Sequence, residues 1–437
     1  MSAFTPTIFR VLVSVVCLGA AFTALAQEEI HASPERMEQR IQALSQFGAN
    51  PEGGVSRVAF SEADRAGREY IEALMRDAAL DVRVDTAGNL IGRRAGREDG
   101  LPPILFGSHI DSVPGGGNYD GDVGVIGAIE VIELLNEHGI VTRHPLEVVS
   151  FTDEEGGLTG SRAMVGSLSA DALEIVSHSG LTIRDGIRQV GGDPDRLDLA
   201  ARKAGDLTAY VELHIEQGAI LDEADIDIGV VEGIVGIRWW EVTVEGMANH
   251  AGTTPMDRRR DALVSAAELT LAINRIAREL EGRQVATVGQ IRASPGAPNV
   301  VPGKVTMSLE IRDLDAAKMQ RVFDRIEEKA GRIAEGNATP IAFAELDLAA
   351  PPAPTDERLR AIVAQAADEL GLTHKRMPSG AGHDAQDLAK IAPIGMIFVP
   401  SVGGISHSPR EFTSAQDMAN GASVLLRTVL AVDGGAL

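Results

Sequence analysis

The sequence predicts an α/β fold, in which a mostly parallel sheet covered by helices carries a smaller inserted module. Two observations lead to this prediction. Short apolar runs that end in polar residues alternate with segments of helical periodicity, which is typical of parallel sheets flanked by helices. Between residues 235 and 350 this alternation gives way to a different order of elements, and it resumes afterwards.

Capping signals and apolar spacing define the elements of the larger part. Ser33-Pro34 combines an N-cap with proline at the first helical position, so it starts a helix towards residue 46. Ser61 caps a second helix that ends near residue 80, and apolar spacing predicts a third over 123–138. The apolar runs predict strands over 104–106, 146–151, 209–213 and 396–399. Because ligands bind beyond the carboxyl ends of parallel strands, the polar residues that follow are expected to form a site.

The inserted segment has its own pattern. It contains a strand over 239–244, a helix over 261–280, strands over 285–291 and 305–311, and a helix over 315–335, with a candidate last strand over 341–346. This β-α-β-β-α order predicts a ferredoxin-like (split βαβ) module. We therefore expect a larger, site-bearing domain formed by 27–234 and 351–437, and an inserted domain over 235–350.

The composition limits the classes of protein to consider. A chain of 437 residues, 44% hydrophobic and 24% charged, has the composition of globular proteins and the length of about two or three domains. The 40 Lys and Arg residues against 63 Asp and Glu residues give a net charge of −23. Because a surface that binds phosphate backbones needs clustered cations, nucleic acid is excluded as an expected partner.

The first 26 residues have the pattern of a secretory signal peptide. Arg10 precedes an apolar run over 11–25, and Ala24-Leu25-Ala26 forms a small-residue cleavage site before Gln27. The run is too short for a comfortable membrane span, which leaves an uncleaved anchor as the weaker alternative. The single cysteine, Cys17, lies in this segment, so the mature chain is expected to be thiol-free, periplasmic and without a membrane partner. Disulfides and zinc–thiolate sites are thereby excluded.

Histidine and carboxylate residues cluster around the ends of the predicted strands. These residues are His109, Asp111, Asp120, Glu154, Glu155, His214 and His407. Imidazole and carboxylate groups without sulfur suit Zn²⁺, Mn²⁺ or Co²⁺, and two such ions can share one carboxylate. A single histidine at a strand end is more often a satisfied polar residue, so the prediction of a metal site depends on the joint pattern.

Several motifs resemble those of known hydrolases. Gly107-Ser108-His109-Ile110-Asp111-Ser112-Val113 resembles the first metal motif of the dinuclear zinc hydrolases that include aminoacylase and carboxypeptidase-type exopeptidases. Five further motifs resemble the N-carbamoyl-L-amino-acid hydrolase and allantoate amidohydrolase branch: Glu212-Leu213-His214-Ile215-Glu216-Gln217-Gly218, Ala248-Asn249-His250-Ala251-Gly252-Thr253-Thr254-Pro255-Met256, Pro298-Asn299-Val300-Val301-Pro302-Gly303, Ser379-Gly380-Ala381-Gly382-His383-Asp384-Ala385 and His407-Ser408-Pro409-x-Glu411. The resemblance covers essentially the whole mature chain.

This resemblance implies ligands for two divalent ions. His109, Asp120 and His214 would hold one ion, and Asp120, Glu155 and His407 would hold the other, so that Asp120 bridges them. Zn²⁺ is the expected metal, and Mn²⁺, Co²⁺ and Ni²⁺ are the alternatives.

The resemblance also implies roles for two neighbouring acids. Glu154 holds no ion in this scheme and would be the general base. Asp111 would accept a hydrogen bond from the second ring nitrogen of His109 and fix its tautomer, the alternative being an acid that caps a turn. The stretch 156–160 departs from the shorter connection of many carbamoylases, so a differently shaped loop is expected beside Glu155.

The inserted domain would act as a lid and dimerisation domain and would bind substrate. Arg312 would clamp the substrate carboxylate, the alternative being a surface arginine paired with Asp313 or Asp315. Asn299 and His250 would hydrogen-bond the substrate and stabilise its oxyanion.

On the ureido side of the substrate, Gln217 and the backbone near Gly382 would line the site. The resemblance leaves open whether His383 and Asp384 contact substrate. It implies a homodimer, and it leaves open whether His250 serves its own subunit or the partner.

The expected function is that of a metal-dependent amidohydrolase with a small carboxylate substrate, such as an N-carbamoyl amino acid or allantoate. An aminoacylase or dipeptidase is the first alternative. A periplasmic small-molecule binding protein is an alternative of another class, disfavoured because a plain binding protein needs no dinuclear ligand set.

Overall fold

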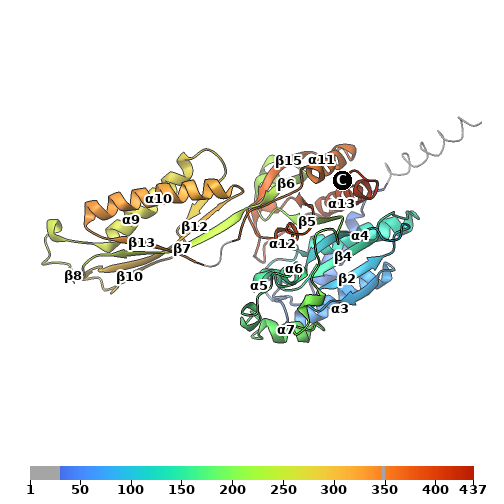
Figure 1. The fold of residues 1–437 in the computed structure, drawn as a ribbon, viewed down its shortest axis with the longest axis horizontal. Coiled ribbons are helices and arrows are strands. Elements are labelled where there is room, and N and C mark those ends of the chain that lie inside the picture. Colours follow the sequence, from blue (N-terminus) through green and yellow to red (C-terminus); the bar gives the residue numbers. More distant parts are fainter. Residues whose placement is uncertain (1–29, 347–349) are drawn as a thin grey trace, which may run out of the picture. The chain divides into compact units, whose positions relative to one another are not determined.

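A computed structural model describes residues 30–346 and 350–437, so the predicted signal peptide lies outside the described residues. The described chain divides into two compact units, which Figure 1 shows as ribbons. Unit 1 contains the described residues up to Glu232 together with Thr355–Met377 and His383–Leu437, and unit 2 contains Gly233–Pro354 and Pro378–Gly382. The short segment Pro378–Gly382 therefore belongs to unit 2, although the residues on either side of it in the sequence belong to unit 1.

Unit 1 contains most of a nine-stranded mixed sheet with strand order β1-β2-β4-β3-β5-β16-β6-β14, in which β15 also pairs with β6. The strands are β1 (Asp81–Val84), β2 (Leu90–Arg94), β3 (Ile104–His109), β4 (Leu146–Phe151), β5 (Ala209–Ile215), β6 (Ile228–Ile234), β14 (Ala353–Pro354), β15 (His374–Ser379) and β16 (Ile394–Val399). Strand β14 and the last two residues of β6 and β15 fall within the ranges of unit 2. The central strands β4, β3, β5 and β16 are mutually parallel, whereas β1, β2, β6 and β14 pair antiparallel. The predicted parallel sheet is therefore confirmed for its centre, which has antiparallel margins.

Two helices of unit 1, α2 (Pro34–Leu44) and α3 (Glu62–Asp77), begin directly after the capping residues that the sequence predicts. The unit also contains α4 (Asp122–Glu137), α5 (Glu154–Gly157), α6 (Thr159–Met164), α7 (Ile183–Gln189), α8 (Ile220–Ala224), α11 (Glu357–Glu369), α12 (Asp384–Leu388) and α13 (Ala415–Asp433). The side chains of Ser33 and Ser61 accept hydrogen bonds from the first turns of α2 and α3. Helix α4 packs on β3, β5 and α13, and its nearly continuous apolar sequence is buried in the main core.

Unit 2 contains an antiparallel sheet of order β10-β12-β7-β13, with β9 also paired to β12. Its elements are β7 (Gly236–Glu245), β8 (Asn249–His250), α9 (Ala262–Glu279), β9 (Val285–Thr287), β10 (Ile291–Ser294), β11 (Val300–Val301), β12 (Lys304–Asp313), α10 (Ala316–Asn337) and β13 (Ile341–Glu345). The predicted strand over 285–291 is thus divided into β9 and β10. The short strands β8 and β11 pair with each other at one end of this unit.

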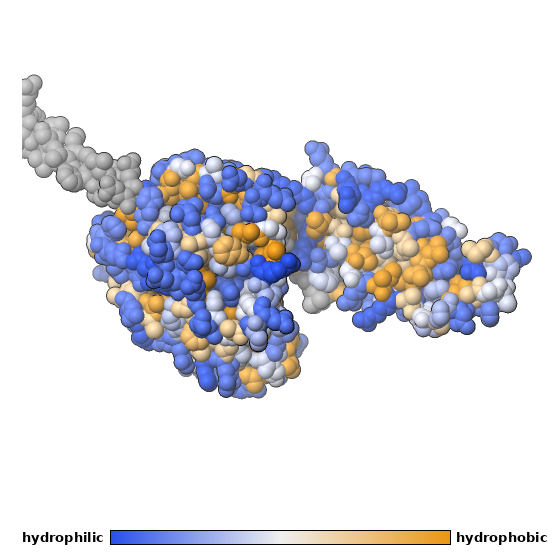
Figure 2. Space-filling model, turned by 180° about the vertical axis from the view of Figure 1, so that it is seen from behind, coloured by the Kyte–Doolittle hydropathy of each residue, from blue (hydrophilic) through white to orange (hydrophobic). Residues whose placement is uncertain are grey.

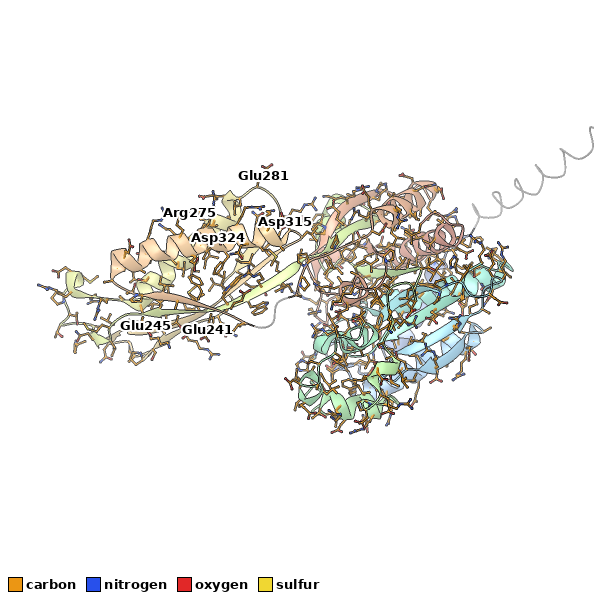
Figure 3. All side chains as sticks on the ribbon, viewed as in Figure 1. Glu241, Glu245, Arg275, Glu281, Asp315 and Asp324 are labelled. Atoms are coloured by element: carbon orange, nitrogen blue, oxygen red, sulfur yellow. The ribbon has the colours of Figure 1, made fainter. Side chains whose placement is uncertain are left out.

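The pattern of β7 shows how unit 2 forms its core. Trp240, Val242 and Val244 are buried against α9 and α10, and Trp240 stacks on Phe323 at 4.5 Å between ring centroids. Glu241 and Glu245 alternate with them along the strand and are exposed. Arg275 of α9 and Asp324 of α10, which are labelled in Figure 3, are exposed as well. In the described part of the chain, no helix is both long and apolar enough to cross a membrane.

Candidate metal centre

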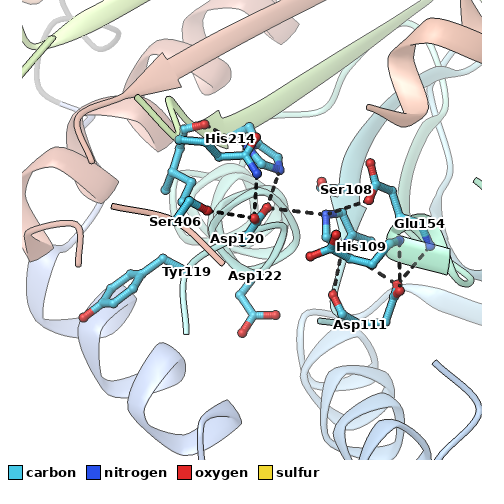
Figure 4. Close-up of polar contacts among 12 residues, drawn as sticks. Ser108, His109, Asp111, Tyr119, Asp120, Asp122, Glu154, His214 and Ser406 are labelled. Atoms are coloured by element: carbon cyan, nitrogen blue, oxygen red, sulfur yellow. Dashed lines mark hydrogen bonds and ion pairs between the residues drawn. The ribbon is translucent and has the colours of Figure 1, made fainter. Parts of the chain in front are cut away.

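The predicted metal ligands of unit 1 come together beyond the carboxyl ends of the central strands (Figure 4). His109 is the last residue of β3, and His214 lies near the end of β5. Asp120 immediately precedes α4, and Glu155 lies in α5 directly after β4. His407 lies in the loop between β16 and α13 and has a left-handed φ of 51°. The parallel register of the strands brings these loops to one edge.

Two donor groups share Asp120. In each group, all ligand atoms lie within 4.8 Å of one another: His109, Asp120 and His214 form one, and Asp120, Glu155 and His407 form the other. Oδ1 of Asp120 lies 3.1 Å from Nε2 of His214 and 3.8 Å from Nε2 of His109. Its other oxygen, Oδ2, lies 3.2 Å from Nε2 of His407, which is 3.3 Å from Oε1 of Glu155. Each carboxylate oxygen of Asp120 therefore faces a different group, as a bridging ligand would.

Backbone carbonyls orient the two buried histidines. Nδ1 of His109 lies 2.9 Å from the carbonyl oxygen of Asp111, and Nδ1 of His214 lies 2.9 Å from that of Ile215. A carbonyl oxygen only accepts hydrogen bonds, so each ring carries a proton on Nδ1 and directs Nε2 towards Asp120. This arrangement prepares the Nε2 atoms as metal ligands before any ion binds.

The carboxylate of Asp111 lies near His109, as predicted, but its hydrogen bonds go to other groups. Its Oδ1 lies 3.7 Å from Nδ1 of His109, which the Asp111 backbone carbonyl already occupies. The carboxylate instead accepts hydrogen bonds from the backbone N–H groups of Glu154 and Glu155, each at 3.2 Å. Asp111 therefore fixes the histidine through its main chain and the two glutamates through its side chain, closer to the turn-capping alternative.

Glu154 lies beside the donor groups without belonging to either. Its Oε2 is 3.7 Å from Nε2 of His109 (Figure 4). Burial raises the pKa of this carboxyl well above its ordinary value, and the neighbouring carboxylates of Asp384 and Glu155 raise the pKa further. A carboxylate with a raised pKa is better suited to take up and release a proton than an ordinary one.

The donor groups fit divalent cations. Burial alone would lower the pKa of His214, but the carboxylates of Asp120 and Glu212 raise it to about 9. Asp120 and Glu155 raise the pKa of His407 to about 10. Protons on these rings thus neutralise carboxylates where cations would otherwise do so. His214 Nε2 and Glu155 Oε1 are also buried, and their near polar neighbours are other members of the donor groups, Asp120 at 3.1 Å and His407 at 3.3 Å, as expected of atoms that bind metal.

Other polar residues support the centre without having been predicted as site residues. The buried Glu212 accepts hydrogen bonds from the Ser108 hydroxyl at 2.7 Å and the Ala385 backbone N–H at 3.2 Å. It also forms a close group with His214 and His383. The signal that could have revealed it is an acid inside an otherwise apolar strand, two residues before His214 and therefore on the same face.

Gln217 lies at the donor groups, since its Nε2 donates to Oδ2 of Asp120 at 2.7 Å. The stretch 156–160 forms the end of α5 and the start of α6, joined at Leu158 with a left-handed φ of 58°. Thr159 closes this turn with a hydrogen bond of 2.5 Å to Asp153. The departure from the carbamoylase pattern is therefore a tight helical turn.

The predicted substrate residues of unit 2 lie at two separate places. His250 is on β8, and the backbone carbonyl of the neighbouring Asn299 accepts from Ala251 at 2.9 Å. Arg312 lies near the far end of β12, which starts at Lys304 close to β11. At about 3.4 Å per residue, eight residues of strand separate these two places by roughly 27 Å. Within unit 2, Arg312 and His250 are thus too far apart to touch one small substrate.

The guanidinium group of Arg312 binds a carboxylate, but not that of either predicted partner. Its Nε and Nη2 donate to the two oxygens of Glu310 at 2.7 and 3.2 Å, and Nη1 donates to the carbonyl of Gly380 at 2.8 Å. The predicted pairing with Asp313 or Asp315 is wrong, because residues two apart on a strand share a face and adjacent residues do not. Asp313 pairs with Lys318, and Asp315 caps α10. Gly382 belongs to the same short segment of unit 2 as Gly380.

The fold and the two donor groups define a class of metal-dependent α/β hydrolases. Residues 105–431 match the model of Peptidase family M20/M25/M40. The chain is 45% identical over 400 residues to an N-carbamoyl-L-amino acid amidohydrolase of Geobacillus stearothermophilus (90% of this chain, 97% of the relative). It is 40% identical over 405 residues to a ureidoglycolate hydrolase of Arabidopsis thaliana (90% and 85%). A solved hydantoinase/carbamoylase family amidase from Burkholderia multivorans superposes with a TM-score of 0.84 at 37% identity (92% and 98%).

The chain therefore belongs to peptidase family M20/M25/M40 and is a metal-dependent amidohydrolase that acts on carbon–nitrogen bonds. Among the expectations from sequence, the resemblance to the carbamoylase branch is confirmed. The alternative of a small-molecule binding protein is not retained, because the relatives are enzymes.

Proposed function

We propose that this protein hydrolyses the ureido carbon–nitrogen bond of a small carboxylate, such as an N-carbamoyl amino acid or allantoate. The observation that carries the proposal is the arrangement in which each oxygen of Asp120 faces a separate donor group and Glu154 lies beside them. In the overall reaction of an N-carbamoyl amino acid, water adds to the carbamoyl carbon and its bond to the amino nitrogen breaks. The products are the amino acid, ammonia and carbon dioxide.

The donor groups would hold two divalent ions. His109 and His214 would bind one ion, Glu155 and His407 the other, and Asp120 both. Zn²⁺ suits these ligands, as do Mn²⁺, Co²⁺ and Ni²⁺. Such ions lower the pKa of a bound water and polarise a carbonyl, which is the chemistry that hydrolysis of a ureido group needs.

Glu154 would move the proton in this reaction. Its raised pKa lets the carboxylate accept a proton from the attacking water and then donate it to the leaving nitrogen. The backbone hydrogen bonds from Glu154 and Glu155 to Asp111 hold the start of α5 in place. Asp111 is therefore a positioning residue for this step.

Arg312 would bind the substrate carboxylate. The names of the two relatives describe substrates in which a ureido group lies beside a carboxylate. The geometry of the Arg312–Glu310 pair demonstrates that its guanidinium can hold a carboxylate with two hydrogen bonds. Substrate would then exchange with Glu310 or use the remaining N–H groups of the fork. Gln217 and the segment that contains Gly382 would contact the ureido side.

A substrate panel tests this proposal. We expect the purified enzyme to release ammonia and an amino acid from N-carbamoyl-α-amino acids, or ammonia from allantoate. We expect N-acetyl amino acids and dipeptides to be cleaved much more slowly. Removal of the ions with a chelator should abolish the reaction, and added Zn²⁺ or Mn²⁺ should restore it. Preferred cleavage of acetyl amino acids or dipeptides would instead establish the aminoacylase or dipeptidase alternative.

We also propose that unit 2 is an inserted lid that forms a homodimer and lends His250 and Asn299 to the partner's site. Arg312 lies about 27 Å along β12 from Lys304, the end of the strand that is close to β11 and His250, and this separation supports the proposal. Apolar side chains of α9 also face solvent, with Val264 49% and Leu271 67% exposed. Figure 2 shows further hydrophobic residues on the visible face of unit 2. Contiguous exposed apolar residues often mark protein interfaces.

Complementation between two inactive variants tests the shared site. A hybrid of a His250→Ala subunit and a Glu154→Gln subunit contains one complete site only if His250 acts across the dimer. We therefore expect co-expression of the two variants to restore activity that neither has alone. Absence of activity in isolated hybrids would place His250 in its own subunit's site.

The proposed location is the periplasm. The Ala24-Leu25-Ala26 pattern predicts that the exported protein begins at Gln27. N-terminal sequencing of protein recovered from the periplasm checks this prediction. Exported material that retains residue 1 or 2 would contradict the predicted cleavage.

A further inference from the structure

Glu411 joins the two loops that carry Asp120 and His407. Its Oε1 accepts hydrogen bonds from the backbone N–H groups of Tyr119 at 2.9 Å and Asp120 at 3.1 Å. Its Oε2 accepts from the Ser406 hydroxyl at 2.7 Å and the His407 backbone N–H at 3.3 Å. One buried carboxylate therefore holds each loop with a different oxygen, although residues 119 and 411 are 292 positions apart in the sequence.

The glycine-rich loop is shaped to receive this carboxylate. A Cβ atom at Gly117 would collide with the carboxylate of Glu411. The backbone of Gly117 does not have a positive φ, so an alanine would be strained only by this collision. The glycine thus makes room for the side chain of Glu411, which explains its place in the loop before Asp120.

Both loops need an external anchor at the donor groups. His407 has a left-handed φ of 51°, a conformation that costs energy for a residue other than glycine. The Ser406 hydroxyl lies 3.1 Å from Oδ2 of Asp120 as well as 2.7 Å from Glu411. Its single proton can serve only one carboxylate at a time, so Glu411 keeps this hydroxyl satisfied when Asp120 binds a cation.

We propose that Glu411 is a positioning residue that sets the spacing of Asp120 and His407 and thereby the affinity of the second metal ion. This inference rests on the proposed dinuclear centre. His109 and His214 are oriented independently, by the carbonyls of Asp111 and Ile215. The group of Asp120, Glu155 and His407 instead takes two of its three donors from the loops that Glu411 holds. Loss of Glu411 should therefore weaken binding of the ion held by Asp120, Glu155 and His407 more than binding of the other ion.

Three variants test this inference by metal binding. Glu411→Gln keeps the size of the side chain, but its amide nitrogen cannot accept hydrogen bonds, so one loop loses its anchor. Gly117→Ala displaces Glu411 without changing any charge. Asp433→Asn is a matched control, because Asp433 is a buried carboxylate that accepts from the backbone N–H groups of Arg143 and His144 at 3.0 and 2.8 Å, away from the donor groups.

Metal-free full-length protein is titrated with Zn²⁺ in competition with a chromophoric chelator, and thermal unfolding of the metal-free form is recorded. We expect the wild type and Asp433→Asn to bind two ions with the same affinities. In Glu411→Gln and Gly117→Ala, we expect the ion held by two histidines to lose little affinity and the other to bind about 10- to 100-fold more weakly, because only the latter takes two donors from the loops that Glu411 holds. Thermal unfolding of the metal-free variants measures how far each substitution lowers the stability of the fold. We expect Asp433→Asn to be destabilised as the other variants are, but to keep its metal affinity.

Two results would overturn the inference. If both Glu411→Gln and Gly117→Ala bind two ions as tightly as the wild type, Glu411 does not set the affinity, while the proposed function stands. If Asp433→Asn lowers the affinity for the second ion as much as Glu411→Gln does, the loss of affinity results only from a less stable fold. A wild-type protein that binds no Zn²⁺ at all would contradict the proposed metal centre as well.

Discussion

Replacing Glu154 by glutamine is expected to lower turnover by about a hundredfold or more, because the glutamine amide cannot accept the proton of the attacking water. Glu154 lies outside both donor groups, so the variant should keep its full metal content. The side chains are nearly isosteric, and the backbone N–H group at 154 still donates to Asp111. The measurements are kcat with the preferred ureido substrate and metal analysis of the same preparation.

The control for Glu154→Gln is Glu98→Gln. Glu98 is a half-exposed glutamate of unit 1 that pairs with Arg143 at 2.8 Å and lies outside the donor groups. This variant should retain wild-type turnover. Near-normal turnover of Glu154→Gln with both ions bound would assign the general base to another residue. Loss of the metal together with activity would instead make Glu154 a ligand.

Removal of Arg312 is expected to abolish the preference for an acid over its neutral amide. A bidentate, charge-assisted pair between Arg312 and a substrate carboxylate contributes about 2–4 kcal/mol, or about 30- to 900-fold in kcat/KM. The observable is the ratio of kcat/KM for an N-carbamoyl amino acid to that for its carboxamide analogue. The wild type should prefer the acid strongly, and Arg312→Ala should nearly lose this preference with its metals still bound. Arg312→Lys keeps the charge without the fork and should also be impaired.

Arg238 provides a matched control for this experiment. It lies on β7 opposite Ile311 and pairs with Glu345 at 2.7 Å, much as Arg312 pairs with Glu310. Arg238→Ala therefore removes a comparable surface pair of the same sheet and should leave the acid preference intact. If Arg312→Ala discriminates as strongly as the wild type, Arg312 is only a structural partner of Glu310. The carboxylate would then be recognised elsewhere.

Local signals in the sequence determined most of the elements that carry the site. Ser33 and Ser61 cap the helices that they were expected to cap, because a side-chain oxygen can satisfy free N–H groups only at a helix start. The apolar runs that predict strands end at the polar residues, so β3 ends at His109 and β4 ends just before the glutamates. Strand and helix alternation then places His109, Glu155 and His214 at one edge of a parallel sheet. The resemblance to the hydrolases then indicated which of these residues would bind the same ion.

The tertiary structure alone decided which side chains meet. Residue types predicted a role for Asp111, but the turn after β3 places its carbonyl, rather than its carboxylate, against His109. Glu310 rather than Asp313 holds Arg312, because the direction of the side chain on β12 decides the contact. Contacts between residues far apart in the sequence, such as that of Glu411 with the loop of Asp120, depend on how distant loops pack against each other. Hydrophobic spacing and capping are local properties, and they do not specify this closure.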